Sequence, residues 1–385
     1  VVLSLGALLI AYLGFTHVTP AAIAAKVPHD WVSLIPKWSP DYLSGTEYKL
    51  FGALMIIWMM KGLLLSLSGP EQLYDFQRFL AAKNPKEASK MGALWGIIHT
   101  VRWPMAMALA ALGIVGMASV GDPEKVLPSV IQSMLPVGIR GFAIAALLPG
   151  FLATFNSTVN GGASYMVKDI YHKYIKPDAS DKTLIRASYV SSALLIVLGA
   201  TIGFFATSIN QMFTWIMGTL GAGVLMPNVL RWYWWRVNGW GYAIGTICGM
   251  LLSLVQAFVP YFSALPLYVT FPAIALMVLI VTIIVTLATE PTDQKTLREF
   301  YTKVRPGGIW GPVAKDATPA VKGPKSTTKR DALNVIIGIP WITSMYLCPV
   351  YLILHRFAEA GITAGIVAVA SVILYQTWYK TLSEE

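Results

Sequence analysis

The chain has 385 residues, of which 56% are hydrophobic and 12% are charged, and its net charge is +10. This composition excludes an ordinary soluble domain and is typical of an all-α polytopic membrane protein. The positive charge indicates basic loops on one membrane face, and we expect no nucleic-acid partner. The two cysteines, Cys248 and Cys348, lie in apolar runs and predict no disulfide framework.

We expect about ten transmembrane helices, because a helix needs about 20 mostly apolar residues to cross a bilayer. The first span is short and the chain does not start with Met, so we expect further sequence before Val1. The predicted spans are residues 1–15, 49–68, 92–116, 138–166, 184–207, 211–233, 241–259, 266–288, 332–354 and 360–379.

Basic residues are unevenly divided between the two faces that these spans define. The loops near 69–91, 167–183, 234–240 and 289–331, the C-terminus and the adjoining span ends carry 21 Lys and Arg residues, against 6 on the opposite side. Cytoplasmic loops carry the excess of Lys and Arg. The asymmetry predicts a multi-pass protein of the cell inner (plasma) membrane with a cytoplasmic C-terminus.

The stretch from Leu147 to Tyr171 starts as an apolar helix and then carries a run of neutral oxygens. Oxygen-bearing side chains are costly in hydrocarbon unless they face a cavity, a partner helix or an ion. Oxygens are also the ligands that a hard cation such as Na⁺ prefers. The run therefore indicates a sodium site; its oxygen-bearing residues are Thr154, Asn156, Ser157, Thr158 and Asn160.

No short catalytic signature is present in the chain. The five histidines have no metal-ligand spacing on a single helix, and there is no phosphate-binding GxxxxGK[ST] loop. The sequence therefore favours neither an enzyme nor an ATP-driven pump. We expect no cofactor other than Na⁺ as a coupling ion.

Four separate motifs, in the right order, resemble the sodium/solute symporter family, which includes the sodium/glucose, proline and sialic acid symporters. The first is QRFLAAKNPKEA, similar to the inner loop after the sixth core helix. The second, FNSTVNGGASYMVKDIY (Phe155–Tyr171), resembles the eighth core helix. The third, RWYWWRVNGWG (Arg231–Gly241), resembles the end of the tenth. The fourth, EPTDQKTLREFYTKVRPGGIW (Glu290–Trp310), resembles the loop after the twelfth.

The resemblance implies the five-plus-five inverted-repeat fold, with the binding site at the midplane between the repeats. On this mapping the first four core helices are absent and residues 1–15 form the last helix of the first repeat. Residues 16–48 form an extracellular loop and 49–235 the second five-helix repeat. The remaining parts are peripheral transmembrane helices (236–289), a cytoplasmic loop (290–331) and two C-terminal transmembrane helices with a short tail (332–385).

The resemblance places the main sodium site at Gly150, Ala153 and Thr154. Gly150 supplies a carbonyl and Thr154 a hydroxyl, whereas Ala153 stands where family members often have a second hydroxyl. The alternative is that the Thr154 hydroxyl only bonds back to its own helix. Asn156 and Ser157 match a second sodium site of some members, and interhelical hydrogen bonding is an equal alternative for them.

The span 49–68 corresponds to the substrate-facing broken helix, which Gly69 and Pro70 interrupt. Lys61 lies mid-span, where a buried ammonium is costly and indicates function, and it suggests a solute with a carboxylate. A snorkelling lysine is an equal alternative. The candidate substrate or gate residues are Lys61, Ser66, Ser68, Gln72 and Trp215.

The sequence thus predicts sodium-coupled secondary active symport of a small polar organic solute by alternating access. The expected partners are Na⁺, this solute and the lipid bilayer. The alternative is a non-transporting structural membrane subunit that derives from a symporter and kept its helices.

Overall fold

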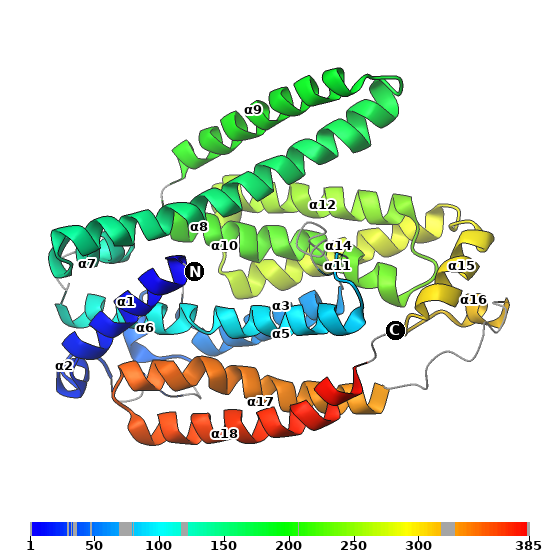
Figure 1. Ribbon diagram of the computed structural model, residues 1–385. Helices are drawn as coiled ribbons and strands as arrows, with labels where there is room; N and C mark the ends of the chain where they lie inside the picture. Colours follow the sequence, from blue (N-terminus) through cyan, green and yellow to red (C-terminus); the bar gives the residue numbers. More distant parts are fainter. Residues whose placement is uncertain are drawn as a thin grey trace. The chain divides into compact units, whose positions relative to one another are not determined.

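The computed structural model describes residues 2–28, 31, 33, 37–46, 48–68, 79, 81–116, 122–206, 208–316 and 328–382. Within these ranges the chain is helical, with one isolated bridge and no strand (Figure 1). This confirms the expected all-α class. Gly69, Pro70 and Gln72 lie outside the described residues.

Among the described residues, seven helical stretches are long and apolar enough to cross a membrane. Two shorter apolar helices, Ser4–His17 and Phe51–Leu67, accompany them. The chain is therefore a multi-pass membrane protein, while the figure of ten spans and the repeat architecture stay predictions. The seven stretches are Lys86–Gly116, Val137–Ile175, Asp181–Phe205, Gly239–Phe258, Leu267–Ala288, Lys329–Ile353 and Phe357–Thr381.

Contacts divide the chain into two compact units. Unit 1 comprises residues 1–29, 74–204 and 326–385, and unit 2 comprises residues 30–73 and 205–325. The predicted second repeat, 49–235, contributes helices to both units. The division into repeats, loops and peripheral helices remains a prediction.

Unit 1 contains two long helical hairpins, α8 (Val137–Ser164) with α9 (Asp181–Phe205) and α17 (Thr328–Ile353) with α18 (Phe357–Thr377) (Figure 1). Asn84 caps the start of α5 (Pro85–His99), because its side chain accepts a hydrogen bond from the Glu87 backbone N–H at 2.8 Å. The other helices are α1 (Val2–His17), α2 (Pro20–Ala24), α6 (Arg102–Gly116) and α7 (Val126–Met134). The π-helix η3 (Tyr165–Ile175) continues α8.

The centre of unit 1 is the packing of α1 against α6. A Cβ at Gly14 would collide with Ala108, whose side chain is fully buried, so the glycine permits a close approach of the two backbones. Ile10, Ala11 and Ile353 complete this core cluster.

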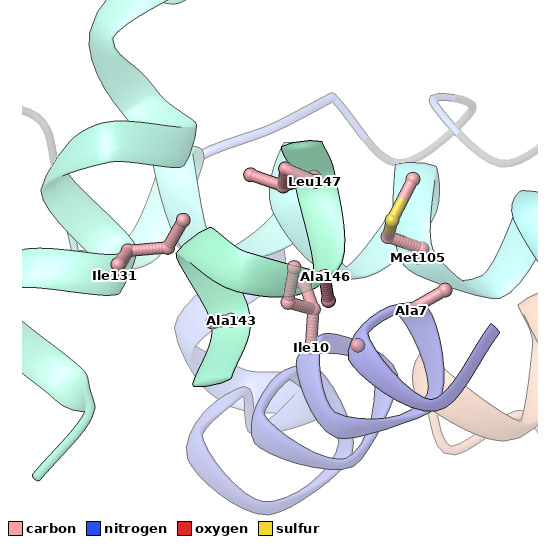
Figure 2. A pocket seen from close by; sticks show the side chains of 8 residues that line it. Ala7, Ile10, Met105, Ile131, Ala143, Ala146 and Leu147 are labelled. Atoms are coloured by element: carbon pink, nitrogen blue, oxygen red, sulfur yellow. The ribbon is translucent and has the colours of Figure 1, made fainter. Parts of the chain in front are cut away.

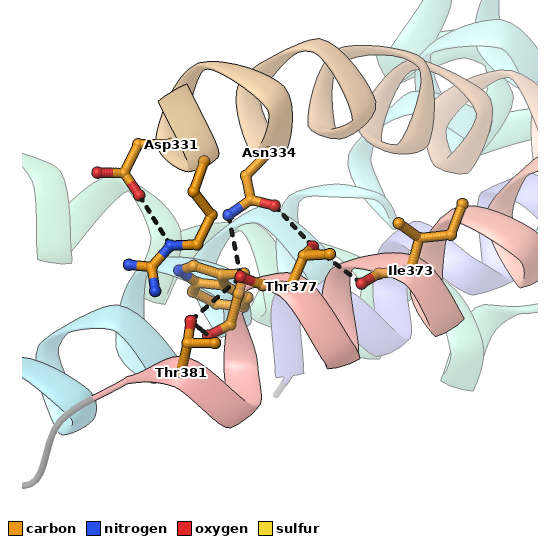
Figure 3. A network of polar contacts seen from close by, with 7 residues as sticks. Asp331, Asn334, Ile373, Thr377 and Thr381 are labelled. Atoms are coloured by element: carbon orange, nitrogen blue, oxygen red, sulfur yellow. Dashed lines mark hydrogen bonds and ion pairs between the residues drawn. The ribbon is translucent and has the colours of Figure 1, made fainter. Parts of the chain in front are cut away.

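The hairpin of α17 and α18, orange to red in Figure 1, is held by hydrogen bonds between its two helices. Figure 3 shows Asn334 and Thr377 as a reciprocal pair, with the Thr377 hydroxyl donating to Asn334 Oδ1 at 2.7 Å. Trp341 Nε1 donates to the Ser371 hydroxyl at 2.8 Å. Such bonds favour association of helices in lipid, where water offers no alternative partner.

The turn of this hairpin also binds the C-terminal end of α1. His355 adopts a left-handed backbone with φ of 55°, and its ring stacks on Phe15 with centroids 4.6 Å apart. Its Nε2 lies 2.9 Å from the Phe15 carbonyl oxygen. The last carbonyls of a helix lack intrahelical donors, so this contact satisfies one of them.

Unit 2 surrounds a second core, formed by Ile57, Ala222, Leu225, Phe271, Ile274, Ala275 and Val278. These residues belong to α3 (Phe51–Leu67), α11 (Gly221–Tyr233) and α14 (Leu267–Ala288). The other elements of the unit are η1 (Asp41–Leu43), α10 (Ile209–Thr214), the π-helix η4 (Trp215–Leu220), α12 (Gly239–Phe258), α13 (Pro260–Ser263), α15 (Gln294–Val304) and α16 (Gly311–Asp316).

Glycines spaced four residues apart on α12 allow α11, α12 and α14 to pack closely. A Cβ at Gly241 or Gly245 would collide with the Thr286 or Thr282 hydroxyl of α14. One at Gly249 would collide with the backbone of Gly223 on α11. Gly223 and Gly249 therefore both serve helix packing.

We therefore predict that Gly249→Val destabilises the protein. Forcing two backbones apart in a packed core costs about 1–3 kcal/mol, which thermal unfolding of the detergent-solubilised protein will register as a lower midpoint. Gly365→Val on α18 is the control, because a Cβ there meets nothing within 4 Å. Equal midpoints for the two variants would contradict close packing at Gly249.

Candidate functional site

The second half of α8 has one bulky face and one face of small or oxygen-bearing residues. At 3.6 residues per turn, Phe151, Phe155 and Val159 fall on the bulky face. The rings of Phe151 and Phe155 stack with centroids 5.5 Å apart. Gly150, Thr154 and Ser157 fall on the other face. Of the five oxygen-bearing residues of the run, Thr154 and Ser157 therefore fall close together, whereas Asn156 lies about 160° around the helix from Thr154.

Both faces of α8 are largely uncovered within unit 1, and Phe151 of the bulky face is 61% exposed. Ala153, Thr154 and Asn156 are exposed, and Gly150 and Ser157 are half-buried. Membrane helices turn polar residues toward partner helices, cavities or ions. The polar face is therefore where we expect α8 to meet an ion or another helix.

Hydrogen bonds place three of the candidate oxygens close together. The Thr154 hydroxyl donates to the Gly150 carbonyl at 3.2 Å, and the Ser157 hydroxyl donates to the Thr154 carbonyl at 3.0 Å. The back-bonding weighed as an alternative for Thr154 is therefore present. It leaves the hydroxyl oxygen with lone pairs that a cation can use. Ala153 has no side-chain oxygen and can contribute only its carbonyl.

The candidate ligands are all neutral. Residues 141–167 contain no charged side chain. Among the described residues, no group of three His, Cys, Asp or Glu side chains lies together. Carboxylates supply much of the affinity of Ca²⁺ and Mg²⁺ sites, so a neutral set of hydroxyl and carbonyl oxygens suits a monovalent cation better.

Unit 1 also contains an apolar pocket between α1, α6, α7 and α8. Figure 2 shows Ala7 and Ile10 of α1 facing Ala143 and Ala146 of α8, with Met105 beside them. Its lining offers carbon and sulfur atoms but no side-chain oxygen. This pocket therefore lacks the ligands for a sodium ion and is distinct from the polar face of α8.

In unit 2, Lys61 lies on α3 beside aromatic rings and the start of α11. Its Nζ is 4.7 Å from the centre of the Trp58 ring, which in turn stacks on Phe213 at 6.4 Å. A Cβ at Gly221 would lie 3.9 Å from the same Nζ. An ammonium over an indole face is stabilised by a cation–π interaction. No pattern in the sequence marks Trp58 or Phe213 as neighbours of Lys61.

The other candidate substrate residues are placed differently. Ser66 donates to the Gly62 carbonyl at 2.9 Å, and fully buried Ser68 donates to the Leu65 carbonyl at 2.7 Å, so both hydroxyls bond within α3 and its end. Trp215 Nε1 donates to the Ser253 carbonyl on α12 at 3.1 Å. The structure thus brings Lys61 together with Trp58, Phe213 and Gly221, and it turns the Trp215 nitrogen toward α12.

Trp215 is also the first residue of the π-helix η4, which links α10 to α11. Short π-helical turns interrupt the regular hydrogen-bond pattern and occur frequently at functional sites. Hydrophobic periodicity does not distinguish such a turn from an α-helix, so this feature could not be read from the sequence.

Comparison with known proteins identifies the family. The sequence profile of the sodium:solute symporter family matches residues 1–249. The chain belongs to the sodium:solute symporter family. The matched part includes α3, α8, α10 and α11, and therefore every candidate site residue.

Individual relatives are transporters, not enzymes. The chain is 28% identical to a sodium/glucose cotransporter of Vibrio parahaemolyticus over 49% of this chain and 38% of the relative. It is 24% identical to the osmoregulated proline transporter OpuE of Bacillus subtilis over 65% and 52% of the two chains. It is 30% identical to a sodium/pantothenate symporter of Haemophilus influenzae over 45% and 36%. The matches thus span between about a third and a half of each relative's length.

Proposed function

We propose that the protein carries out sodium-coupled symport of a small organic solute. The observation that carries this proposal is the family match, because it covers the helix with the sodium candidates. The relatives named above are sodium-coupled cotransporters or solute transporters. The neutral oxygen face of α8 supports the same conclusion from chemistry alone.

The proposed sodium site uses the Gly150 carbonyl, the Thr154 hydroxyl and the backbone around Ala153. An ion there replaces its hydration shell with oxygens and draws α8 toward whichever element supplies the remaining ligands. Asn156 and Ser157 are proposed for a second ion. Coupling requires only that sodium and solute favour the same conformation of the protein. Alternating access then releases both on the cytoplasmic side.

The proposed solute carries a carboxylate that meets Lys61. A lysine inside a membrane span is expensive unless its charge is used, and here it lies over Trp58 and beside Gly221. Gly221 places no side chain between α11 and the ammonium. Trp58 and Phe213 provide apolar surface for the rest of the solute. Ser66, Ser68, Gln72 and Trp215 are retained as candidate gate or substrate residues.

Uptake into proteoliposomes tests the proposal. The protein, expressed from its complete reading frame, should accumulate one member of a panel of labelled sugars, amino acids and carboxylates when an inward sodium gradient is applied. Choline in place of sodium should abolish accumulation. Sodium-independent binding to another membrane protein, with no uptake of any solute, would favour the structural-subunit alternative.

We predict that Thr154→Ala raises the sodium concentration for half-maximal uptake about three- to tenfold, since one ligand worth about 1 kcal/mol is lost. The maximal rate at saturating sodium should change less. Thr201→Ala is the matched control, because Thr201 is exposed on α9 and makes the same bond to a carbonyl four residues earlier, at 2.8 Å. Unchanged sodium dependence in Thr154→Ala would remove this residue from the site.

We predict that Lys61→Met abolishes uptake of a carboxylate solute while the protein remains folded. Methionine keeps the length and apolar stem of lysine but cannot pair with an anion. Lys61→Arg keeps the charge and should retain part of the activity. Wild-type uptake of a carboxylate solute by Lys61→Met, with an unchanged unfolding midpoint, would show that Lys61 does not bind the solute.

A further inference from the structure

Two of the motifs that carried the family resemblance contact each other, although they lie about 75 residues apart in the sequence. The first motif contains Tyr233, the last residue of α11, and the second motif contains Gly308, Ile309 and Trp310. The second motif lies beyond residue 249, outside the stretch that matches the family profile. The contact therefore joins α11, which the profile covers, to residues 308–310, which it does not cover.

The C-terminal end of α11 receives its missing hydrogen bonds from this second motif. The Ile309 N–H donates to the Tyr233 carbonyl at 2.6 Å, and Trp310 Nε1 donates to the Trp232 carbonyl at 2.9 Å. In return the Trp235 N–H donates to the Ile309 carbonyl at 3.2 Å. The terminal carbonyls of a helix otherwise depend on water or side chains. Here a distant segment supplies two of the donors.

The segment is itself rigidly seated. Trp310 is 4% exposed and packs with its ring centroid 5.5 Å from that of Phe300 and 6.1 Å from that of Tyr301, both on α15. Leu297 and Val313 complete this buried cluster. α15 is amphipathic, and its apolar face packs against protein in this cluster. The cluster therefore acts as an anchor for residues 308–310.

Gly308 makes the close approach possible. Its φ is +101°, a conformation that residues with a side chain rarely adopt. A Cβ at this position would lie 2.5 Å from the Tyr233 carbonyl oxygen. The chain thus uses a glycine where the segment crosses the end of α11.

We propose that residues 308–310 form a clamp that fixes the C-terminal end of α11 throughout the transport cycle, with Trp310 as a positioning residue. This inference rests on the proposed symport function. α11 begins at the end of the π-helix η4, beside Lys61, and its other end is held by the clamp. Rigid secondary-structure elements carry energetic coupling between sites. The clamp keeps α11 hydrogen-bonded to its last residue, so that α11 can move as one rigid element when its N-terminal end moves. The clamp therefore affects the rate of transport without contributing ligands.

The first test is Trp310→Phe, which keeps an aromatic ring in the cluster and removes the donor to Trp232. The maximal uptake rate per folded molecule should fall about fivefold, equivalent to about 1 kcal/mol, while half-saturation by sodium and solute stays within about twofold. Trp240→Phe is the matched control, because Trp240 is 67% exposed at the start of α12. A wild-type rate per folded molecule in Trp310→Phe would overturn the proposal.

The second test replaces the clamp by a covalent bond. Trp234 and Ile309 are bridge partners, so the pair Trp234→Cys and Ile309→Cys should form a disulfide when Cys248 and Cys348 are replaced by Ala. Oxidation should leave uptake intact and should restore the rate in the Trp310→Phe background. Failure of the disulfide to form, detected by mass spectrometry of peptides, would contradict the clamp geometry. Reversible loss of uptake on oxidation would show that the clamp opens.

The cross-link separates this inference from the proposed function. If the disulfide forms but the unmodified protein shows no sodium-driven uptake, the symport proposal fails and the clamp loses its role in transport, although the contact itself stands. If uptake is normal but no disulfide forms, the clamp alone fails.

Discussion

The structure depends on one constraint, which is that every polar atom inside a bilayer needs a partner. Most threonine and serine hydroxyls of the described helices meet it by donating to carbonyls of their own helix, as Thr282 does to Val278 at 2.7 Å. Asn334 and Thr377 meet it across a hairpin. Thr154 and Ser157 of α8 also donate to carbonyls of their own helix. The reason for proposing an ion there is the family match, together with the neutral oxygens that Gly150, Thr154 and Ser157 place close to one another.

The same constraint explains the contrast between the two groups of small residues. On α12, Gly241, Gly245 and Gly249 are buried and bring backbones into contact, so their role is packing. Gly150 and Ala153 on α8 are not buried and lie among oxygens. Small residues therefore serve helix association on α12, whereas on α8 they leave the backbone uncovered. Their surroundings, not their identity, decide which.

Much of this organisation could be predicted from the sequence. Apolar length indicated the membrane helices, and the motif around Phe155 indicated both the family and the candidate sodium residues. The contact between Arg231–Gly241 and Glu290–Trp310 could not be predicted, because no periodicity links segments so far apart. The π-helix at Trp215 and the rings around Lys61 were missed for the same reason: each depends on tertiary packing. The site assignments and the number of spans remain predictions.

The central claim is that this protein binds sodium through neutral oxygens and couples it to a solute. Thermal unfolding of the protein from its complete reading frame, in sodium chloride against choline chloride, tests it most directly. A ligand at about 100 times its dissociation constant stabilises the folded state by about 2.7 kcal/mol. The account predicts a higher unfolding midpoint in sodium, increased further by one solute. Identical midpoints in sodium and choline, with and without every solute tried, would contradict it.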